Sequence, residues 1–380
     1  MKATIVTYAD EFAKREVQEL ARAAGYTVAE VIGLRHLMKS EYGVGVGKAD
    51  ELAQVVSENG SGMIIVDESM TSAQANNLAK VTHVEVIDRE RLILNIFAQR
   101  AATTQAKLQV QLAELRYELP RTKDVVRNSA AGERAGFMGI GELAVDVKFK
   151  ALKRRMTTVQ EKLARADTNR SVQRKERMKR GEPLVSLAGY TSSGKTTLFN
   201  RLASESKEES PKLFTTLSTT TRAVSFPGTK RRVMLSDTVG FISRLPTYLV
   251  ESFKSTLEEL TYADLVLLVV DVSESPETVE LKLSSCMETL GQLAVDPKKV
   301  LLVLNKVDLL SQGAPVPAFG GPLGGLASVK TSATRGDGMR RLRVQIMERT
   351  REGDAKRARG IRRQTAWAGE PGRRNALSLA

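Results

Sequence analysis

The stretch "GYTSSGKTTLFN", residues 189–200, decides the fold. It follows the apolar run "LVSLAGY" and fits the pattern G-x-x-x-x-G-K-[ST] at Gly189, Gly194, Lys195 and Thr196. In such a loop consecutive backbone N–H groups point at phosphate groups, and glycine at position 194 permits the close approach. The sequence therefore predicts a P-loop between a strand and a helix, with phosphate-binding residues Gly189, Tyr190, Thr191, Ser192, Ser193, Gly194, Lys195, Thr196 and Thr197.

Two of these side chains predict how the phosphates and a metal ion are held. The Lys195 ammonium is expected to balance charge on the β- and γ-phosphates, and the Thr196 hydroxyl to join the oxygen shell of a Mg²⁺ cofactor. The segment "DTVG", Asp237 to Gly240, ends the apolar run "RVMLSD". Asp237 would hold Mg²⁺ through water, and the Gly240 N–H would contact the γ-phosphate.

A threonine-rich segment, "LFTTLSTTTR" (residues 213–222), precedes this strand and predicts a second contact with the γ-phosphate and Mg²⁺. Thr216 is the preferred metal ligand, and Thr215 and Thr220 are alternatives. Both segments lose a contact when the γ-phosphate leaves, so their conformation is expected to depend on whether GTP or GDP is bound, as in a nucleotide switch. The predicted switch residues are Phe214, Thr215, Thr216, Leu217, Ser218, Asp237, Thr238, Val239, Gly240 and Phe241, the predicted catalytic residues Lys195, Gly240 and Thr216, and the predicted metal ligands Thr196, Thr216 and Asp237.

The segment "NKVD", Asn305 to Asp308, selects the base. The Asp308 carboxylate can accept hydrogen bonds from guanine N1–H and its exocyclic amine, whereas adenine would leave an unpaired contact. The segment "TSA", Thr331 to Ala333, follows the next apolar run and could donate backbone N–H groups to guanine O6. The predicted ligand is therefore GTP or GDP, with guanine-binding residues Asn305, Lys306, Asp308, Ser332 and Ala333.

The fold class predicted for the whole chain is α/β, a P-loop GTPase domain preceded by a small α/β domain and an antiparallel helical hairpin. Residues 1–94 alternate strands with amphipathic helices, and the glycines of "GVGVGKADEL" (Gly43 to Leu52) are interpreted there as a strand-to-helix turn. Residues 95–182 predict the hairpin, residues 183–350 the GTPase domain, and residues 351–380 a basic tail with the composition of a disordered segment.

The predicted hairpin consists of two apolar seams joined by a glycine-rich tip within residues 121–142. One seam is expected to end at Pro120, which removes a helix hydrogen bond. The seams contain Leu108, Leu112, Leu115 and Leu119, and Leu152, Met156, Val159, Leu163 and Ala166.

The charge of the chain is concentrated in two segments. Of the formal net charge of +14, residues 148–182 hold thirteen Lys/Arg against four Asp/Glu, and residues 351–380 hold eight against three. Together they account for the whole excess, which favours a polyphosphate partner such as nucleic acid over a merely solvated helix face and tail. One cysteine, Cys286, and two histidines, His36 and His83, argue against a structural zinc site and a Cys/His triad.

With these motifs the chain resembles the HflX family of ribosome-associated GTPases, over roughly residues 1–350. The resemblance is carried by "GYTSSGKTTLFNRL", "FTTLSTTTR", "LSDTVGFISRLPTYLVESFKSTLEEL" and "NKVDLL", with "VIDRERLILNIFAQRAATTQAKLQVQLAELRYELPR" upstream. It implies a cytoplasmic GTPase that binds the large ribosomal subunit, reaches its rRNA with the hairpin, and promotes separation of stalled or idle ribosomes. No membrane or DNA partner is expected, and the protein is expected to be a monomer.

Three departures limit what the resemblance implies. Ser192 stands where the family usually has asparagine, so potassium stimulation is not carried over. The tip keeps Gly132, Gly139, Gly141 and Glu142 but not the full glycine-rich pattern, and the tail after Arg349 has no counterpart.

Phe241 stands where Ras-like GTPases have a water-orienting glutamine, and a phenyl ring cannot orient water by hydrogen bonding. We therefore expect slow hydrolysis without a partner, and hypothesise that ribosome docking orders the switch segments. Two alternatives stay open: a GTP-regulated protein that binds or remodels free structured RNA, and a nucleotide-dependent scaffold whose hairpin is a solvated coiled coil.

Overall fold

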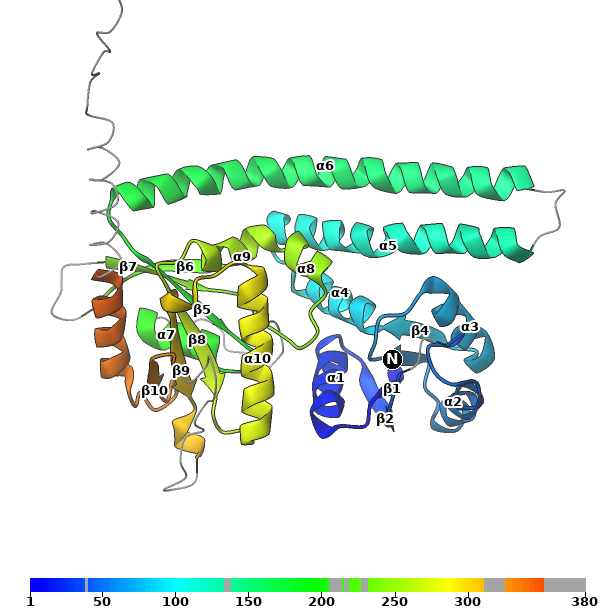
Figure 1. Ribbon diagram of the computed structural model, residues 1–380, viewed down its shortest axis with the longest axis horizontal. Coiled ribbons are helices and arrows are strands. Elements are labelled where there is room, and N and C mark those ends of the chain that lie inside the picture. The colour runs from blue at the N-terminus through cyan, green and yellow to red at the C-terminus, as the bar shows by residue number, and fades with distance from the viewer. Residues whose placement is uncertain are drawn as a thin grey trace, which may run out of the picture.

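The computed structural model describes residues 1–37, 40–132, 138–204, 214, 219–226, 232–310 and 325–351. These residues form two parallel α/β units joined by a long helical hairpin, as the sequence predicts (Figure 1). The expected tail lies outside the described residues from position 352 onward.

The N-terminal unit is a parallel sheet of strand order β2-β1-β3-β4. Its strands are β1 (Lys2–Tyr8), β2 (Thr27–Leu34), β3 (Met63–Val66) and β4 (Glu85–Asp88), and its helices are α1 (Glu11–Ala23), α2 (Val46–Asn59) and α3 (Ser72–Thr82). Helix α1 begins where the Asp10 carboxylate caps the Ala13 N–H at 2.8 Å. Helix α2 begins directly after Gly45, so the "GVGVGK" stretch is a turn into a helix.

The second unit contains the predicted GTPase strands in a sheet of order β10-β9-β8-β5-β7-β6. All its pairs are parallel except the edge strand β6 with β7, which are antiparallel and consecutive in the chain. The strands are β5 (Leu184–Gly189), β6 (Thr220–Ser225), β7 (Arg232–Asp237), β8 (Leu265–Asp271), β9 (Val300–Asn305) and β10 (Ser328–Lys330). The helices are α7 (Lys195–Ala203), α8 (Thr247–Ser252), α9 (Lys254–Thr261), α10 (Pro276–Gln292) and the helix 339–351, with short 3-10 turns at Pro297–Lys299 and Val307–Leu309.

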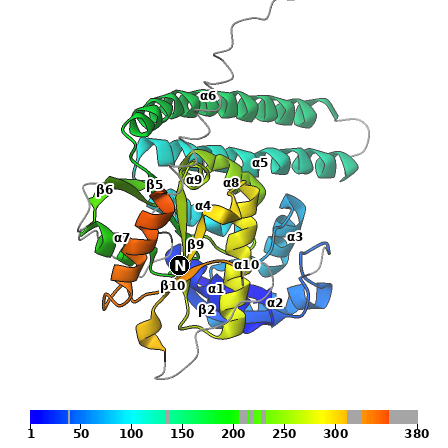
Figure 2. The ribbon, with the colours of Figure 1, turned by 60° about the vertical axis from the view of Figure 1, so that its left-hand side comes forward.

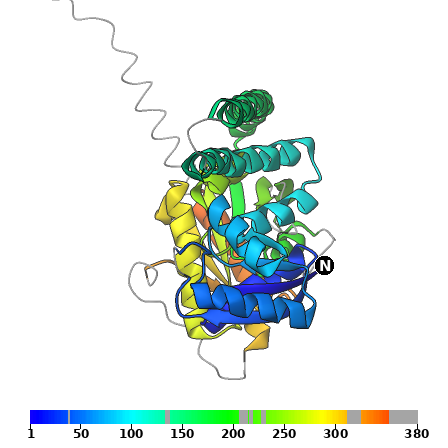
Figure 3. The ribbon, with the colours of Figure 1, turned by 90° about the vertical axis from the view of Figure 1, so that its right-hand side faces the viewer.

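Helix α4 (Arg89–Arg100) connects the first sheet to the hairpin, which is formed by α5 (Thr104–Gly132) and α6 (Met138–Lys179). The two long helices run antiparallel along one side of the molecule and extend over both units (Figure 1), and Figures 2 and 3 show the hairpin on that side from two other directions. Their contact is the predicted apolar seam: Leu112, Leu115, Leu152, Val159 and Leu163 are all buried.

Two expectations for the hairpin are wrong. Helix α5 does not end at Pro120 but continues through it to Gly132, and α6 already begins at Met138, so the helices extend into most of the predicted tip. A proline inside a helix removes one backbone hydrogen bond and costs about 3 kcal/mol. The seam against α6 supplies packing on the N-terminal side of Pro120, and the Thr122 hydroxyl donates to the Glu118 carbonyl at 3.0 Å.

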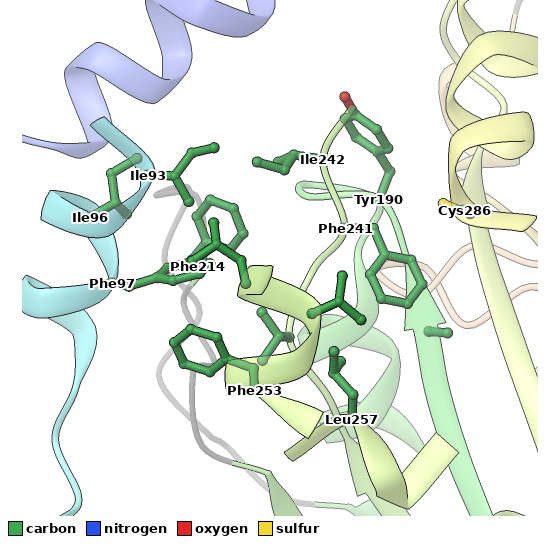
Figure 4. Close-up of a cluster of buried hydrophobic side chains, with 14 of the residues drawn as sticks. Ile93, Ile96, Phe97, Tyr190, Phe214, Phe241, Ile242, Phe253, Leu257 and Cys286 are labelled. Carbon is green, nitrogen blue, oxygen red and sulfur yellow. The ribbon is translucent and has the colours of Figure 1, made fainter. Parts of the chain in front are cut away.

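The largest hydrophobic core is shared between the two units. It runs without interruption from buried side chains of the first unit, such as Leu92, Ile96 and Phe97, to side chains beside the P-loop, such as Phe241 and Ile242. The two α/β units are therefore packed against each other through apolar surface, and residues of the first unit lie next to the nucleotide motifs of the second (Figure 4).

Candidate nucleotide site

The P-loop occupies the carboxyl end of β5, the position where parallel α/β sheets bind ligands. Two glycines are required by close contacts. A Cβ at Gly189 (φ 146°) would lie 2.3 Å from the Val269 carbonyl oxygen, and a Cβ at Gly194 (φ 92°) would lie 2.4 Å from the Asn305 amide nitrogen. The loop is thus pressed against the ends of both β8 and β9, which fixes its backbone for phosphate binding.

The remaining predicted phosphate-binding residues line the same turn. Tyr190, Thr191 and Ser193 are buried, Ser192 is exposed with a left-handed φ of 62°, and Thr196 and Thr197 lie half-buried in the first turn of α7. The structure therefore brings the whole predicted set into one loop and helix N-terminus, where a phosphate group finds both backbone donors and the positive end of the helix dipole.

Lys195 is buried, and its Nζ donates to the Tyr190 carbonyl at 2.6 Å. Burial lowers the pKa of this ammonium group to about 8, although the nearby Asp237 carboxylate opposes the shift. A cation in this environment gains most from a polyanionic ligand, because the ligand replaces the lost hydration. The geometry therefore suits the predicted role of Lys195 beside the β- and γ-phosphates.

Two of the three predicted metal ligands lie together. The Thr196 Oγ1 hydroxyl donates to Asp237 Oδ2 at 3.1 Å, although the residues come from different elements. Their oxygens suit Mg²⁺, which takes few protein ligands and keeps several waters. The described part of the chain holds no group of three or more His, Cys, Asp or Glu side chains arranged for a metal ion. Thr216 lies outside the described residues, as do Thr215, Leu217 and Ser218.

The segment after Asp237 is docked on the P-loop through its backbone. The Phe241 N–H donates to the Gly189 carbonyl at 3.0 Å, and the Thr191 N–H donates to the Phe241 carbonyl at 2.8 Å. Gly240 is held so close that a Cβ there would lie 3.1 Å from Lys195 Nζ.

The side chains around this docked segment point away from the phosphate site. Phe241 is only 1% exposed and lies in the shared core, so its ring does not face the predicted γ-phosphate position (Figure 4). Val239 is buried as well, and the Thr238 hydroxyl donates to the Leu187 carbonyl at 2.6 Å. Phe214, the described residue of the predicted first switch, is also buried in the shared core. Thr220, an alternative metal ligand, is the first residue of β6 and pairs with Asp237.

The predicted guanine-binding residues surround Asn305. Its Nδ2 donates to the Ser193 carbonyl at 2.9 Å, and its Oδ1 accepts from the Ala333 N–H at 3.0 Å and from the Thr331 hydroxyl at 3.3 Å. This amide therefore links the P-loop to the "TSA" loop.

The other guanine-loop side chains are held by polar partners. Lys306 Nζ pairs with Asp271 Oδ2 at 2.6 Å. A hydrogen bond from Ser332 holds the pKa of the Asp308 carboxyl below its usual value, which keeps Asp308 charged as an acceptor.

Sequence reasoning missed a set of polar residues next to the site. Arg89 and Asp67 stand at the carboxyl ends of β4 and β3, and they meet Ser243 and Arg244, which follow the "DTVG" segment. The signal that could have found them is charged residues directly after buried parallel strands, since this edge is where such sheets bind partners.

Three protein families match this chain, in segments that correspond to the N-terminal unit, the hairpin and the GTPase unit. Residues 12–98 match the family described as GTP-binding GTPase N-terminal, residues 100–177 match GTP-binding GTPase Middle Region, and residues 184–306 match 50S ribosome-binding GTPase. These three segments cover most of the chain, including the hairpin and every predicted phosphate-binding residue.

Individual relatives agree. The GTPase HflX of Thermococcus kodakarensis is 42% identical over 303 residues, which are 80% of this chain and 68% of the relative. The GTPase HflX of Escherichia coli is 38% identical over 306 residues, 79% of this chain and 70% of the relative. Among solved structures, a GTP-binding protein from Sulfolobus solfataricus in complex with GDP is 26% identical with a TM-score of 0.46, covering 93% of this chain and 99% of that one. The motifs and the matched segments together identify the chain as a GTP-hydrolysing member of the GTPase HflX family.

Proposed function

We propose that this GTPase uses its nucleotide state to control association with the large ribosomal subunit, and that it acts there on stalled or idle ribosomes. The observation that carries the proposal is the exposed basic face of α6. The basic side chains Lys148, Lys153, Arg154, Lys162 and Arg165 all lie at the surface. At about 100° per residue along the helix, Arg154 and Arg165 lie opposite the buried seam. The description of the matched GTPase segment as 50S ribosome-binding supports the choice of a ribosome as the partner.

The basic face is suited to RNA for electrostatic reasons. Lysine and arginine side chains that neutralise phosphates release condensed counterions, which gives salt-dependent binding. A long helix spreads these charges along its length, so several of them can neutralise phosphates of the same nucleic acid. Acidic side chains are fewer on this helix, and Asp146 already pairs with Lys150 at 3.7 Å.

We call the predicted switch residues 237–241 the second switch. The base of the hairpin contacts the segment that follows it, which supports control of the hairpin by the bound nucleotide. Arg116 Nη1 of α5 donates to the Tyr248 carbonyl and to the Ser252 hydroxyl of α8, each at 3.2 Å. Nearer the start of α5, Gln109 Oε1 accepts from the buried Thr256 hydroxyl of α9 at 2.9 Å. A shift of the second switch would therefore be transmitted to the hairpin that carries the basic face.

The site residues have these roles in the proposed mechanism. The P-loop amides and Lys195 hold the phosphates, the Gly240 N–H contacts the γ-phosphate, and Asn305, Asp308 and the "TSA" loop hold guanine. Thr196, Asp237 and Thr216 would hold Mg²⁺, which neutralises developing charge on the β- and γ-phosphate oxygens when bound. Since the Phe241 ring is buried in the core, no side chain at that position orients the attacking water, and we expect turnover to be slow until a partner arranges the switches.

The proposed setting is the cytoplasm, where ribosomes are available, and the proposed working form is a monomer. No helix within the described residues is long and apolar enough to cross a membrane.

The test is GTP turnover and co-sedimentation with purified large ribosomal subunits, compared for a GTP analogue and GDP. We expect tighter co-sedimentation with the GTP analogue and strong stimulation of turnover, both lost in Lys195→Ala. The double variant Lys153→Glu/Arg154→Glu on α6 should weaken co-sedimentation and flatten its salt dependence. The matched control is Arg340→Glu/Arg341→Glu, an equally exposed basic pair on another helix.

The proposal would be abandoned if subunits neither bound nor stimulated the wild-type protein. Binding of the basic face to free structured RNA, with no effect of subunits on turnover, would favour the alternative of an RNA-binding GTPase. Equal loss in both charge-reversal pairs would show that net charge, rather than the face of α6, determines binding.

A further inference from the structure

A group of polar side chains, buried except for the half-buried Ser243 and the exposed Arg244, joins the N-terminal unit to the nucleotide site, and we refer to it as the interdomain clamp. It consists of Glu16, Asp67 and Arg89 from the N-terminal unit and Tyr190, Ser243 and Arg244 from the GTPase unit. Tyr190 belongs to the P-loop, and Ser243 lies three residues after Gly240. The clamp therefore contacts both parts of the machinery that would surround the γ-phosphate.

Glu16 is the centre of the clamp. Its carboxylate accepts from the Arg89 Nη2 at 2.7 Å, from the Ser243 N–H at 2.9 Å, and from the hydroxyl groups of both Ser243 and Tyr190. The Ser243 N–H also donates to the Tyr190 hydroxyl oxygen at 2.8 Å. Burial raises the pKa of Glu16, but Arg89 and these donors outweigh it, and the pKa lies below its usual value. A buried carboxylate with so many donors holds each of them in one position.

Arg89 and Asp67 extend the clamp along the second switch. Arg89 Nη2 donates to the Ser243 carbonyl at 2.8 Å, and Arg89 Nη1 donates to Asp67 Oδ1 at 2.6 Å. Asp67, fully buried, also accepts from Arg244 Nη2 at 2.8 Å. Arg244 has a left-handed φ of 50°, a conformation that costs a non-glycine residue about 1–2 kcal/mol. The clamp thus stabilises a strained backbone directly after the predicted switch segment.

Apolar contacts support the same arrangement. The Phe97 ring of α4 packs edge-on against Phe214, with centroids 4.8 Å apart at 89°, and against Phe253, with centroids 4.8 Å apart at 73°. Phe214 belongs to the first predicted switch, and Phe253 directly follows α8. Phe97 therefore contacts both the first switch and the end of α8 (Figure 4).

Gly240 is held between these contacts and the P-loop. On one side, the backbone hydrogen bonds of Phe241 with Gly189 and Thr191 dock the segment onto the P-loop. On the other, Ser243 is fixed by Glu16 and Arg89. Tyr190 lies between Gly189 and Thr191, the two P-loop residues that bond to Phe241. The clamp therefore holds the P-loop through Tyr190 and the second switch through Ser243.

We propose that Glu16, Arg89 and Ser243 are positioning residues for the GTPase: they hold the second switch docked on the P-loop, and so place the Gly240 N–H for the γ-phosphate of GTP. The N-terminal unit is then part of the mechanism by which the protein distinguishes GTP from GDP. By linkage, binding of the γ-phosphate also favours the docked arrangement of the N-terminal unit. This inference rests on the role proposed for Gly240 and is independent of the proposed ribosomal partner.

The experiment measures the affinities of the full chain for GDP and for a non-hydrolysable GTP analogue by fluorescent-nucleotide titration, without ribosomes. Ser243→Ala removes only the hydroxyl contacts of the clamp, and Glu16→Gln removes the charge at nearly unchanged volume. In both variants we expect the preference for the GTP analogue over GDP to fall at least about fivefold, the lower end of typical coupling. Affinity for GDP should stay within about twofold, since GDP does not reach Gly240. The two effects should be less than additive in the double variant, because the residues share hydrogen bonds.

The matched control is Glu11→Gln, the same chemical change on the same helix at an exposed residue whose carboxylate pairs with Lys14 at 2.9 Å; its nucleotide preference should be unchanged. Gly240→Ala provides the second reference. If it loses preference for the GTP analogue while Ser243→Ala and Glu16→Gln keep theirs, and only their unfolding temperatures fall, the clamp is merely structural and the inference is wrong. If Gly240→Ala also keeps its preference, the role of Gly240 is refuted, and the clamp proposal with it.

Discussion

Replacing Gly194 by alanine tests whether the P-loop and the guanine-binding loops form one unit through Asn305. A Cβ at this position would lie 2.4 Å from the Asn305 amide nitrogen, a distance that requires one of the groups to move. Asn305 is 2% exposed and cannot move freely, because it is bonded to Ser193, Thr331 and Ala333. The substitution should therefore disturb both loops at once.

The expected magnitude follows from two contributions. Alanine in the left-handed region at φ 92° costs about 1–2 kcal/mol. Displacing Asn305 breaks three hydrogen bonds, each worth about 1 kcal/mol net. The total is about 4–5 kcal/mol. At about 2–4 °C per kcal/mol for a domain of this size, the unfolding temperature should fall by roughly 8–20 °C.

Calorimetry of the nucleotide-free protein measures the stability, and titration with GDP measures binding. GDP binding should weaken at least about a hundredfold, or about 2.7 kcal/mol, because both loops lose their alignment. Gly291→Ala is the control, because this helical glycine has no atom within 4 Å of the point that an added Cβ would occupy, and alanine there should be neutral or stabilising by up to about 1 kcal/mol. A Gly194→Ala protein with unchanged GDP affinity would refute the argument that Asn305 couples the loops.

Three further outcomes are expected. Asp308→Asn should weaken GDP at least about a hundredfold, since two hydrogen bonds to a charged acceptor are lost at about 1.5–3 kcal/mol each, and should bind xanthosine diphosphate better than the wild type does; competition titration measures both. Binding of phosphates should raise the pKa of Lys195 from about 8, so binding takes up protons, and the uptake increases from pH 7.5 to 8.5. Nucleotide affinity should therefore fall as the pH rises through this range. Calorimetry in two buffers of different ionisation enthalpy measures the proton uptake. Leu163→Ala should destabilise the buried seam of the hairpin by about 2–5 kcal/mol, whereas Leu281→Ala, at a side chain that is 54% exposed, should change stability by less than about 0.5 kcal/mol in thermal unfolding.

The nucleotide motifs were predictable because each is local. Glycine spacing, a lysine and a threonine after one apolar run specify the P-loop, and parallel strands bring "DTVG", "NKVD" and "TSA" to the same edge of the sheet. The order of these motifs along the chain therefore predicts both the fold of the GTPase unit and the proximity of Thr196 to Asp237, which the structure places 3.1 Å apart. The seam of the hairpin was equally predictable, since Leu112, Leu115, Leu152 and Leu163 keep a helical period.

The end of α5 was not predictable in the same way. Proline is the strongest local signal for ending a helix, and Pro120 carries that signal. Whether a helix continues past proline depends on tertiary contacts: here α6 packs on α5 up to Leu119, and Arg121 is bonded to Met70 and Asp88 of the N-terminal unit. Local propensity cannot include these contributions, because the contact residues are distant in the sequence.

The interdomain clamp shows the same limit at a functional site. Glu16 lies 227 residues from Ser243 and 174 from Tyr190, and nothing in the local sequence of Glu16 or Ser243 indicates that they meet. Their meeting depends on the shared hydrophobic core, which presses α1 and α4 of the N-terminal unit against the P-loop. An apolar interface sets the position, and buried polar groups within it must then be paired, because an unpaired charge there would cost several kcal/mol. The pairing partners available at this interface are the P-loop and the second switch. If the clamp acts as proposed, the second switch cannot move without repacking this interface, and the N-terminal unit would respond to the nucleotide.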